Sequence, residues 1–327
     1  MFLIVSHNSA LRFWRTFAGD PSVFRRLRTP SPMERPLPLT PELLGELARL
    51  GFAPSKNRPL DLLFSTDAGR SRAAAVLAHA TNLPLPVGSL LQVSEHVAIT
   101  SPELTFALVA RKQDVRHLAL VASELCGTYV PTPPGLPLGT RSPLTSTARL
   151  LTFLTEMYPK QTAAPLVAAR LAFDGAASPM EAKLALLLSL PTRLGGFGLP
   201  RPQLNRPFAL SPEAQLVYPH TPCRLDLSWP GTDLDVEYDG SGDEHSGDMH
   251  AKDVARLAAL RLDGVDVLVL AKQQVYDPRA FAQMVQVIAG KLGGQAGQAG
   301  QARRPWRTRA KDFDEKQAAL REALGLE

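Results

Sequence analysis

Cysteine is scarce in this sequence: only Cys126 and Cys223 occur among 327 residues. Two cysteines are too few for a disulfide framework, and their separation does not match the closely spaced pairs of a zinc site. A chain with so little cysteine is typical of a reducing compartment. We therefore expect a cytoplasmic protein.

Long apolar runs are missing as well. Although 45% of the residues are apolar, no stretch approaches the roughly 18 consecutive apolar residues that cross a bilayer. The apolar opening of residues 1–5 has no basic region before it and no small-residue cleavage pattern after it, so it predicts a first β-strand rather than a leader peptide. We expect a protein that buries a core and makes no contact with a membrane.

The motifs of common small-molecule enzymes are also absent. The sequence holds no phosphate-binding loop, no dinucleotide fingerprint and no nucleophile elbow. Its positive balance, a net charge of +5 with a pI near 9.4, suits a polyanionic partner such as DNA.

Charge is distributed unevenly along the chain. Arginines gather in the first 35 residues and again in the tail after residue 300, whereas the stretch 226–253 is acidic and has a single lysine, Lys252. The acids of that stretch are Asp226, Asp233, Asp235, Glu237, Asp239, Asp243, Glu244, Asp248 and Asp253. Acid packed this densely in a basic protein needs a cation or ample solvent.

Helical and extended patterns alternate along the chain and predict an α/β (α+β) fold with two domains. Prolines in residues 131–138 prevent regular structure, so we place the boundary near them. The predicted parts are an N-terminal α/β domain of unknown role over 1–130, a proline-rich linker with connecting helices over 131–175, a second α/β domain over 176–290, and a Gly/Gln linker with a basic tail over 291–327.

A hairpin is predicted over residues 224–239, because apolar and polar residues alternate strictly on both sides of its turn. A turn centred between Gly231 and Thr232 puts Asp226 directly across from Glu237, and a shift of one residue keeps these two acids diagonal neighbours. Either register gathers carboxylates on one face. Their repulsion then requires a raised pKa, exposure to water or a bound cation.

Hard oxygen ligands of this kind select Mg²⁺, Mn²⁺ or Ca²⁺ rather than zinc. A metal held by two carboxylates and several waters can activate water and stabilise the charge on a phosphate under attack. We therefore predict that Asp226 and Glu237 bind Mg²⁺ or Mn²⁺ for phosphodiester hydrolysis. A solvated hairpin face is the alternative interpretation.

Four motifs follow one another in this part of the chain. They are Ser178-Pro179-Met180-Glu181, Gly195-Gly196-Phe197-Gly198-Leu199-Pro200, Arg224-Leu225-Asp226-Leu227-Ser228-Trp229-Pro230 and Val236-Glu237-Tyr238-Asp239-Gly240. On these motifs the segment 176–275 resembles the PD-(D/E)XK superfamily, and within it the endonuclease-like domains of actinobacterial proteins that are related to very-short-patch repair (Vsr) enzymes. The resemblance implies a central mixed sheet flanked by helices. It makes Asp226 and Glu237 metal ligands, and Glu181 a helix acid that orients water or the ion.

The sequence departs from the superfamily pattern at Asp239, which stands where the superfamily has a lysine. That lysine polarises water and offsets charge in the transition state, so its replacement puts cleavage in doubt. Possible substitutes are Lys183, Lys252, Arg256 and His245, the last because the Vsr-like branch is associated with histidine. The candidate catalytic residues are Glu181, Asp226, Glu237 and His245.

Structural alternatives apply to several of these residues. Glu181 also completes a capping box that begins at Ser178, a role compatible with a place in the site. For His245, a surface position is the more common interpretation of such a histidine. Asp253 and Arg256 are three residues apart on a predicted helix and form, most simply, an exposed ion pair.

Two further segments point towards nucleic acid. Ser6-His7-Asn8-Ser9-Ala10-Leu11 and Ile99-Thr100-Ser101-Pro102-Glu103-Leu104 resemble the region that precedes the nuclease-like domain in AbiEi-family antitoxins. In the tail, cations surround an aromatic side chain that can stack on a base, although a solvated, disordered tail is the alternative. The predicted nucleic-acid-binding residues are Arg303, Arg304, Trp306 and Arg307.

These patterns together predict a Mg²⁺-dependent endonuclease-like protein that acts on DNA, in repair or in defence against mobile elements. The alternative is an antitoxin-like, DNA-binding regulator that keeps the nuclease fold without its catalysis, and Asp239 favours this alternative. No oligomeric state follows from the sequence.

Overall fold

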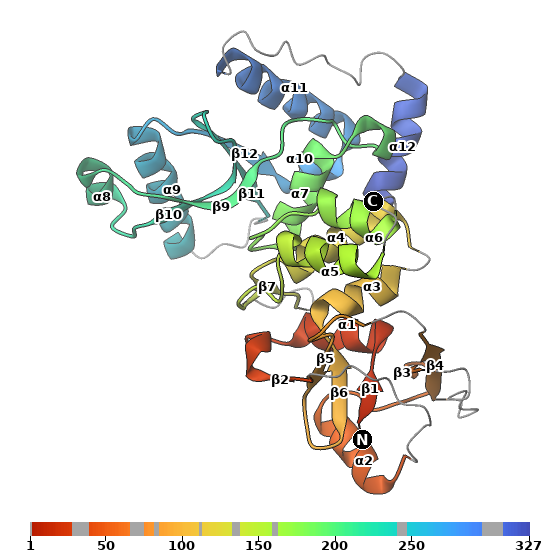
Figure 1. The fold of residues 1–327 in the computed structure, drawn as a ribbon. Coiled ribbons are helices and arrows are strands. Elements are labelled where there is room, and N and C mark those ends of the chain that lie inside the picture. Colours follow the sequence, from red (N-terminus) through yellow and green to blue (C-terminus); the bar gives the residue numbers. More distant parts are fainter. Residues whose placement is uncertain are drawn as a thin grey trace. The chain divides into compact units, whose positions relative to one another are not determined.

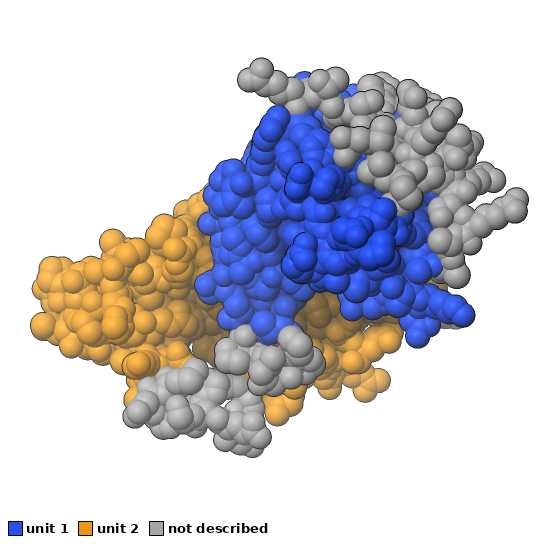
Figure 2. Space-filling view, turned by 90° about the horizontal axis from the view of Figure 1, so that it is seen from below, with its two compact units in different colours: residues 1–174 blue, residues 175–327 orange. Residues whose placement is uncertain are grey.

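The computed structural model describes residues 2–27, 39–65, 75–81, 85–110, 113–132, 138–158, 163–240, 247–295 and 310–327, with the backbone alone at 247–250, 294–295 and 310–311. The chain divides into two compact units, residues 1–174 and 175–327 (Figure 2). Within the described ranges, no helix combines the length and the apolar character that a membrane crossing requires.

The first unit is built on a mixed sheet with the strand order β2-β5-β6-β1-β3-β4 among its described residues (Figure 1). The strands are β1 (Leu3–Val5), β2 (Arg25–Arg26), β3 (Leu60–Phe64), β4 (Val76–Ala80), β5 (Leu90–Gln92) and β6 (Val97–Thr100). β1 runs parallel to β6 and β3 runs parallel to β4, whereas the other pairs are antiparallel. The apolar opening of the sequence therefore forms a strand, as predicted, and all three residues of β1 are buried.

Helices complete the first unit. They are α1 (His7–Thr16), α2 (Pro41–Arg49), α3 (Pro102–Val109), α4 (Val115–Leu125), α5 (Thr147–Met157) and α6 (Ala164–Leu171), with a short 3₁₀ turn at Pro21–Val23 and a small pair of strands, β7 (Tyr129–Val130) and β8 (Gly139–Thr140). Side chains cap the starts of two of these helices: the Thr40 hydroxyl accepts the Leu43 N–H, and the Ser101 hydroxyl accepts the Leu104 N–H.

The first unit reaches beyond the boundary that the prolines predict. Helices α5 and α6 contact each other, α5 also contacts α3, and α6 contacts α4. Leu150, Leu154 and Leu166 on these two helices are fully buried in the core of the unit. The segment predicted as connecting helices therefore belongs to the first unit, because its apolar faces need that core. Part of the proline run, residues 133–137, lies outside the described residues.

The second unit contains a sheet with the order β12-β11-β10-β9 in its described part. The strands are β9 (Gln203–Phe208), β10 (Cys223–Ser228), β11 (Leu234–Asp239) and β12 (Asp266–Ala271), and the helices are α7 (Pro179–Ser189), α8 (Pro212–Val217), α9 (Gly247–Leu262), α10 (Lys272–Tyr276), α11 (Pro278–Gln295) and α12 (Ala310–Leu324), with a 3₁₀ turn, η4, at Thr192–Leu194. β11 and β12 are parallel, and the other pairs are antiparallel.

Apolar side chains join this sheet to its helices. Leu225 of β10, Ala214 of α8 and Leu260 of α9 lie in one buried cluster, and α8 and α9 lie beside the sheet in Figure 1. Helix α7 contacts β10, while α12 contacts α7 and η4. The predicted hairpin and the predicted helix after it are therefore present as β10, β11 and α9. Each unit combines a mixed sheet with flanking helices, so the predicted α/β fold class is confirmed.

Candidate functional site

The candidate site lies where β10 and β11 pair. Their antiparallel register sets Leu227 opposite Val236 and Ser228 opposite Asp235. One step further along the same register, Asp226 comes opposite Glu237. This is the register of a turn centred between residues 231 and 232, the first of the two that the sequence allows.

Asp226 occupies the middle of β10 and is only partly exposed. Burial raises the pKa of its carboxyl, while the positive charge of Arg256 and a hydrogen bond with the backbone of Tyr238 act in the opposite direction. The carboxyl is therefore held close to β11 by the backbone of the residue that follows Glu237.

Glu237 and Asp235 project from β11 into surroundings that exclude water. Glu237 is 5% exposed and Asp235 is fully buried. Within the described part of the chain, neither oxygen of Asp235 has a hydrogen-bond partner, and neither has Oε1 of Glu237. Such buried acceptors are costly to leave unsatisfied.

Burial, together with nearby negative charge, raises the pKa of both Asp235 and Glu237. For Asp235, burial and the charges of Glu237 and Asp226 raise the pKa to about 8. For Glu237, burial is the largest cause and the charge of Asp226 adds to it, so that the pKa rises to about 7 although Arg256 opposes the change. The two carboxyl groups can hydrogen-bond each other only when one of them carries a proton. A proton on one carboxyl or a nearby positive charge relieves the repulsion within the cluster.

Glu181 brings a further acid from helix α7. Its Oε2 accepts a 2.8 Å hydrogen bond from the Ala177 N–H and another from Nδ2 of Asn205. Burial raises the pKa of Glu181, the charge of Asp226 raises it further, and these hydrogen bonds lower it. Its own N–H donates to the Ser178 hydroxyl over 3.2 Å. Glu181 thus hydrogen-bonds the backbone just before the helix and also interacts electrostatically with Asp226.

Arg256 supplies a positive charge to this cluster. From helix α9 its Nη2 donates to Oε2 of Glu237 over 2.5 Å, and its Nη1 donates to the Arg224 carbonyl over 3.2 Å. The ion pair is largely buried, with 22% of the Arg256 side chain and 6% of the Glu237 side chain exposed. The predicted exposed ion pair with Asp253 is wrong, because the guanidinium instead satisfies a buried carboxylate on the sheet.

The other predicted substitutes for the superfamily lysine lie elsewhere. Lys183 is half-buried, and its Nζ donates to the Gly325 carbonyl over 3.4 Å. Lys252 is exposed on α9. His245 lies outside the described residues, as do the predicted nucleic-acid-binding residues Arg303, Arg304, Trp306 and Arg307. Among the described candidates, Arg256 is the one in contact with a predicted ligand.

A divalent cation is compatible with these residues. Hard ions such as Mg²⁺ and Mn²⁺ bind carboxylate oxygens, and Oε1 of Glu237 is a buried oxygen without a hydrogen-bond partner among the described residues. No group of three or more His, Cys, Asp or Glu side chains in the described ranges is arranged to hold a metal ion. Two carboxylates completed by water are a common binding mode for Mg²⁺. Asp226 and Glu237 fit such an ion by this chemistry.

Two residues of the site are missing from the sequence prediction. The alternation of β11 places Asp235, Glu237 and Asp239 on the same side of the strand. Asp235 is buried and Asp239 is exposed, and the sequence pattern does not reveal this difference. Asn205 gave no signal, because its strand β9 was not predicted. It has a positive φ of 50°, a conformation that asparagine tolerates better than most residues, and it donates to both Gly175 and Glu181.

Comparisons with protein-family models, with curated proteins and with solved structures give no match to this chain.

Proposed function

We propose that the second unit is a metal-dependent, endonuclease-like domain that acts on phosphodiester bonds of DNA. The observation that carries the proposal is the opposition of Asp226 and Glu237 on neighbouring strands, inside a buried acidic cluster where Arg256 is the one contacting guanidinium among the described residues. The order of the motifs, which resembles that of PD-(D/E)XK enzymes, supports it. The positive balance of the chain favours DNA as the partner.

Each side chain of the cluster has a role in this proposal. Asp226 and Glu237 would hold Mg²⁺ or Mn²⁺, which supplies an activated water and offsets charge on the phosphate. Glu181, whose pKa is raised by burial, would act as a proton acceptor. Arg256 carries the fixed positive charge that the sequence lacks at Asp239, and a guanidinium can hold a phosphate through two hydrogen bonds.

A nicking assay on supercoiled DNA tests this function. Purified protein is compared with its Asp226→Asn and Glu237→Gln variants in Mg²⁺, in Mn²⁺ and in EDTA, with Asp253→Asn as the control because Asp253 is an exposed acid on α9. The proposal predicts metal-dependent nicking that falls at least about a hundredfold in the two site variants, as for other groups that stabilise a transition state. Equal nicking by wild type and Asp226→Asn contradicts it.

A DNA-binding regulator without nuclease activity is the second candidate. The ion pair of Arg256 with Glu237 favours it, since an internal cation already neutralises one of the two predicted ligands. So does the exposed acid Asp239 at the position of the lysine. Tight, salt-sensitive DNA binding without nicking under any metal condition would support the regulator and exclude the enzyme. In either case, repair or defence against mobile elements in the cytoplasm is the proposed setting.

A further inference from the structure

A cavity of about 500 Å³ in the first unit is lined by three arginines: Arg12 and Arg15 from α1, and Arg58 from the loop before β3. No acidic residue is among the residues that line it. Its apolar wall includes Phe13 and Phe52, whose rings stack with centroids 5.4 Å apart. A strongly basic cavity with an aromatic wall needs an explanation that the proposed nuclease site does not give.

The three arginines differ in whether their charge is paired with an acidic side chain of the protein. Arg15 is fully engaged, because its Nε and Nη2 donate to the two carboxylate oxygens of Glu124 over 2.8 and 2.9 Å. Arg12 contacts only uncharged acceptors in the described part of the chain, the Ser9 hydroxyl at 2.8 Å and the Pro59 carbonyl at 3.4 Å. Arg58 is exposed and makes no side-chain ion pair or hydrogen bond with a described residue. Two guanidinium groups at the cavity therefore retain donors for an anion.

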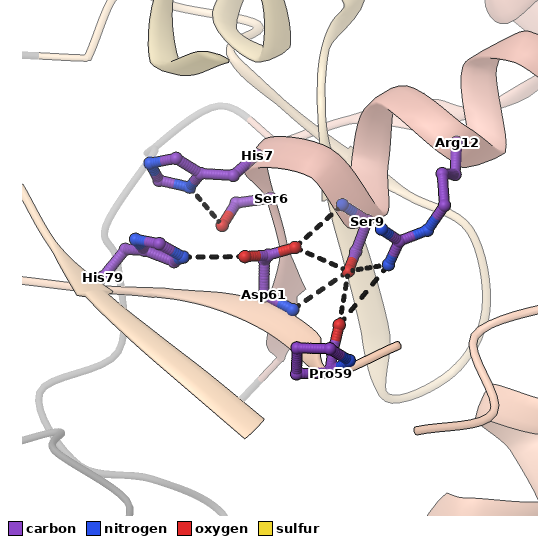
Figure 3. A network of polar contacts seen from close by, with 7 residues as sticks. All are labelled: Ser6, His7, Ser9, Arg12, Pro59, Asp61 and His79. Atoms are coloured by element: carbon purple, nitrogen blue, oxygen red, sulfur yellow. Dashed lines mark hydrogen bonds and ion pairs between the residues drawn. The ribbon is translucent and has the colours of Figure 1, made fainter. Parts of the chain in front are cut away.

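A buried network holds Arg12 in place (Figure 3). Oδ2 of Asp61 accepts the N–H and the hydroxyl of Ser9, and Oδ1 is 2.8 Å from Nε2 of His79. With the Asp61 carboxylate as its acceptor, the Ser9 hydroxyl presents its lone pair to Arg12. The guanidinium is thereby positioned before any ligand arrives, which reduces the entropy that binding costs.

Like charge also accumulates here without a bound partner. Burial lowers the pKa of Arg12, the charge of Arg58 lowers it further, and Asp61 acts in the opposite direction. An anion between the two guanidinium groups relieves this repulsion. Phosphate is the anion that arginines bind in the bidentate manner, and an aromatic side chain next to it offers a surface for a base.

We propose that this cavity binds the phosphate of a nucleotide, with Arg12 and Arg58 on the phosphate and Phe13 beside the nucleoside. The size of the cavity is within the range of small-ligand sites, roughly 300–1,000 Å³, so it suits one nucleotide rather than a duplex. The nucleotide is either free or the phosphorylated end of a single strand, and both present the same chemistry. The proposal concerns the first unit and does not require nuclease activity in the second.

Calorimetric titration of the full chain with thymidine 5′-monophosphate, thymidine and inorganic phosphate tests the site. We expect the monophosphate to bind at least about tenfold more tightly than thymidine, since one charged hydrogen bond is worth this factor or more. It should also bind more tightly than inorganic phosphate, because the nucleoside adds a contact with Phe13. Arg58→Ala removes an exposed side chain and should abolish the advantage over thymidine. Arg49→Ala is the matched control, because Arg49 is also exposed and does not line the cavity.

A short oligothymidylate with and without a 5′-phosphate separates the two sources. Tighter binding of the phosphorylated strand than of the monophosphate, again lost in Arg58→Ala, identifies a strand end. Equal or weaker binding of the strand identifies a free nucleotide. Equal affinity for thymidine and its monophosphate, equal affinity for inorganic phosphate, or equal effects of Arg58→Ala and Arg49→Ala would overturn the proposal. Arg12→Lys, which keeps the charge but loses the bidentate geometry, should weaken binding of the monophosphate as well.

Discussion

The acids of the second unit show how single side chains depend on one another. Burial raises the pKa of Asp226, Asp235 and Glu237, and the charge of Asp226 raises the pKa of the other two further. Arg256 opposes that effect at both Asp226 and Glu237. If this guanidinium is the internal counter-ion of the cluster, its removal should destabilise the unit through Glu237.

Arg256→Gln is predicted to reduce the free energy of unfolding by about 2 kcal/mol in chelator. This is less than the roughly 3–5 kcal/mol for breaking a fully buried pair, because the Arg256 side chain is 22% exposed. Urea unfolding measures this change. As a control, Arg261→Gln on the exposed part of α9 should alter the free energy of unfolding by less than about 0.5 kcal/mol. In the double variant with Glu237→Gln the loss should be smaller than the sum of the single losses. Additive losses would contradict a direct interaction.

Asp61 gives the first unit a predictable dependence on pH. Burial alone raises the pKa of this carboxyl, but hydrogen bonds with His79 and Ser9 outweigh burial, so the pKa in the folded state lies below the ordinary value. A depressed pKa means that the stabilisation is complete above the unfolded value of about 3.9 and is lost as the pH falls through the folded one.

Asp61→Asn should therefore destabilise the protein at neutral pH, and the gap from wild type should narrow below about pH 4. Guanidinium unfolding of both proteins across this range measures it. A gap that widens as the pH falls would mean that the network favours the protonated carboxyl.

At the level of elements, local patterns predict many helices and strands well. Helix α4 is an example, because Asp114 caps its start through its side chain and apolar residues recur on one face. The hairpin of β10 and β11 is likewise predictable, since the alternation fixes which side chains share a face. The opposition of Asp226 and Glu237 follows from that alternation together with the position of the turn.

Elements that depend on distant partners escape such patterns. β9 contains Asn205 and Pro207, which weaken its strand pattern, and it forms by pairing along β10. The sequence of helix α12 is highly charged, so residues 310–324 were included in the predicted linker and tail. Leu320 and Leu324 of this helix are nevertheless buried. The contact of Arg256 with Glu237 is also tertiary, so helical spacing alone favoured the wrong partner.

A substitution at Gly195 tests how closely α12 packs against the loop that contains this glycine. A Cβ at this position would lie 2.1 Å from the Lys316 carbonyl oxygen of α12, and the residue has a φ of +90°. Gly195→Ala should therefore loosen α12, with a loss of roughly 2–4 kcal/mol that combines steric overlap with the roughly 1–2 kcal/mol of a left-handed backbone.

Gly231→Ala provides the control, since φ is +85° there but nothing lies within 4 Å of the added Cβ. It should cost only the backbone contribution, about 1–2 kcal/mol. Hydrogen exchange should show faster exchange in α12 for Gly195→Ala alone. Equal protection of α12 in both variants would argue against close packing of this helix on the loop.

On the scale of the whole molecule, the two compact units have separate hydrophobic cores. The core of the first extends from β1 to α6, and a core of the second joins α8, α9 and the sheet. The candidate metal ligands belong entirely to the second unit, whereas the arginine cavity belongs to the first.

This division predicts that residues 175–327 fold without the first unit. The fragment should unfold cooperatively in urea, because its core and its sheet are complete within it. Its affinity for Mn²⁺ should equal that of the full chain within about threefold, a margin of less than 1 kcal/mol. A fragment without a cooperative transition would mean that the core of the second unit depends on the first.

The most direct test of the central claim, that Asp226 and Glu237 together bind a divalent cation, is calorimetric titration of the full chain with Mn²⁺. Wild type should show one site, and Asp226→Asn and Glu237→Gln should each lose affinity by at least about tenfold, because each removes a charged ligand. Asp253→Asn should bind like wild type. Unchanged affinity in both site variants would exclude a metal site formed by these two residues.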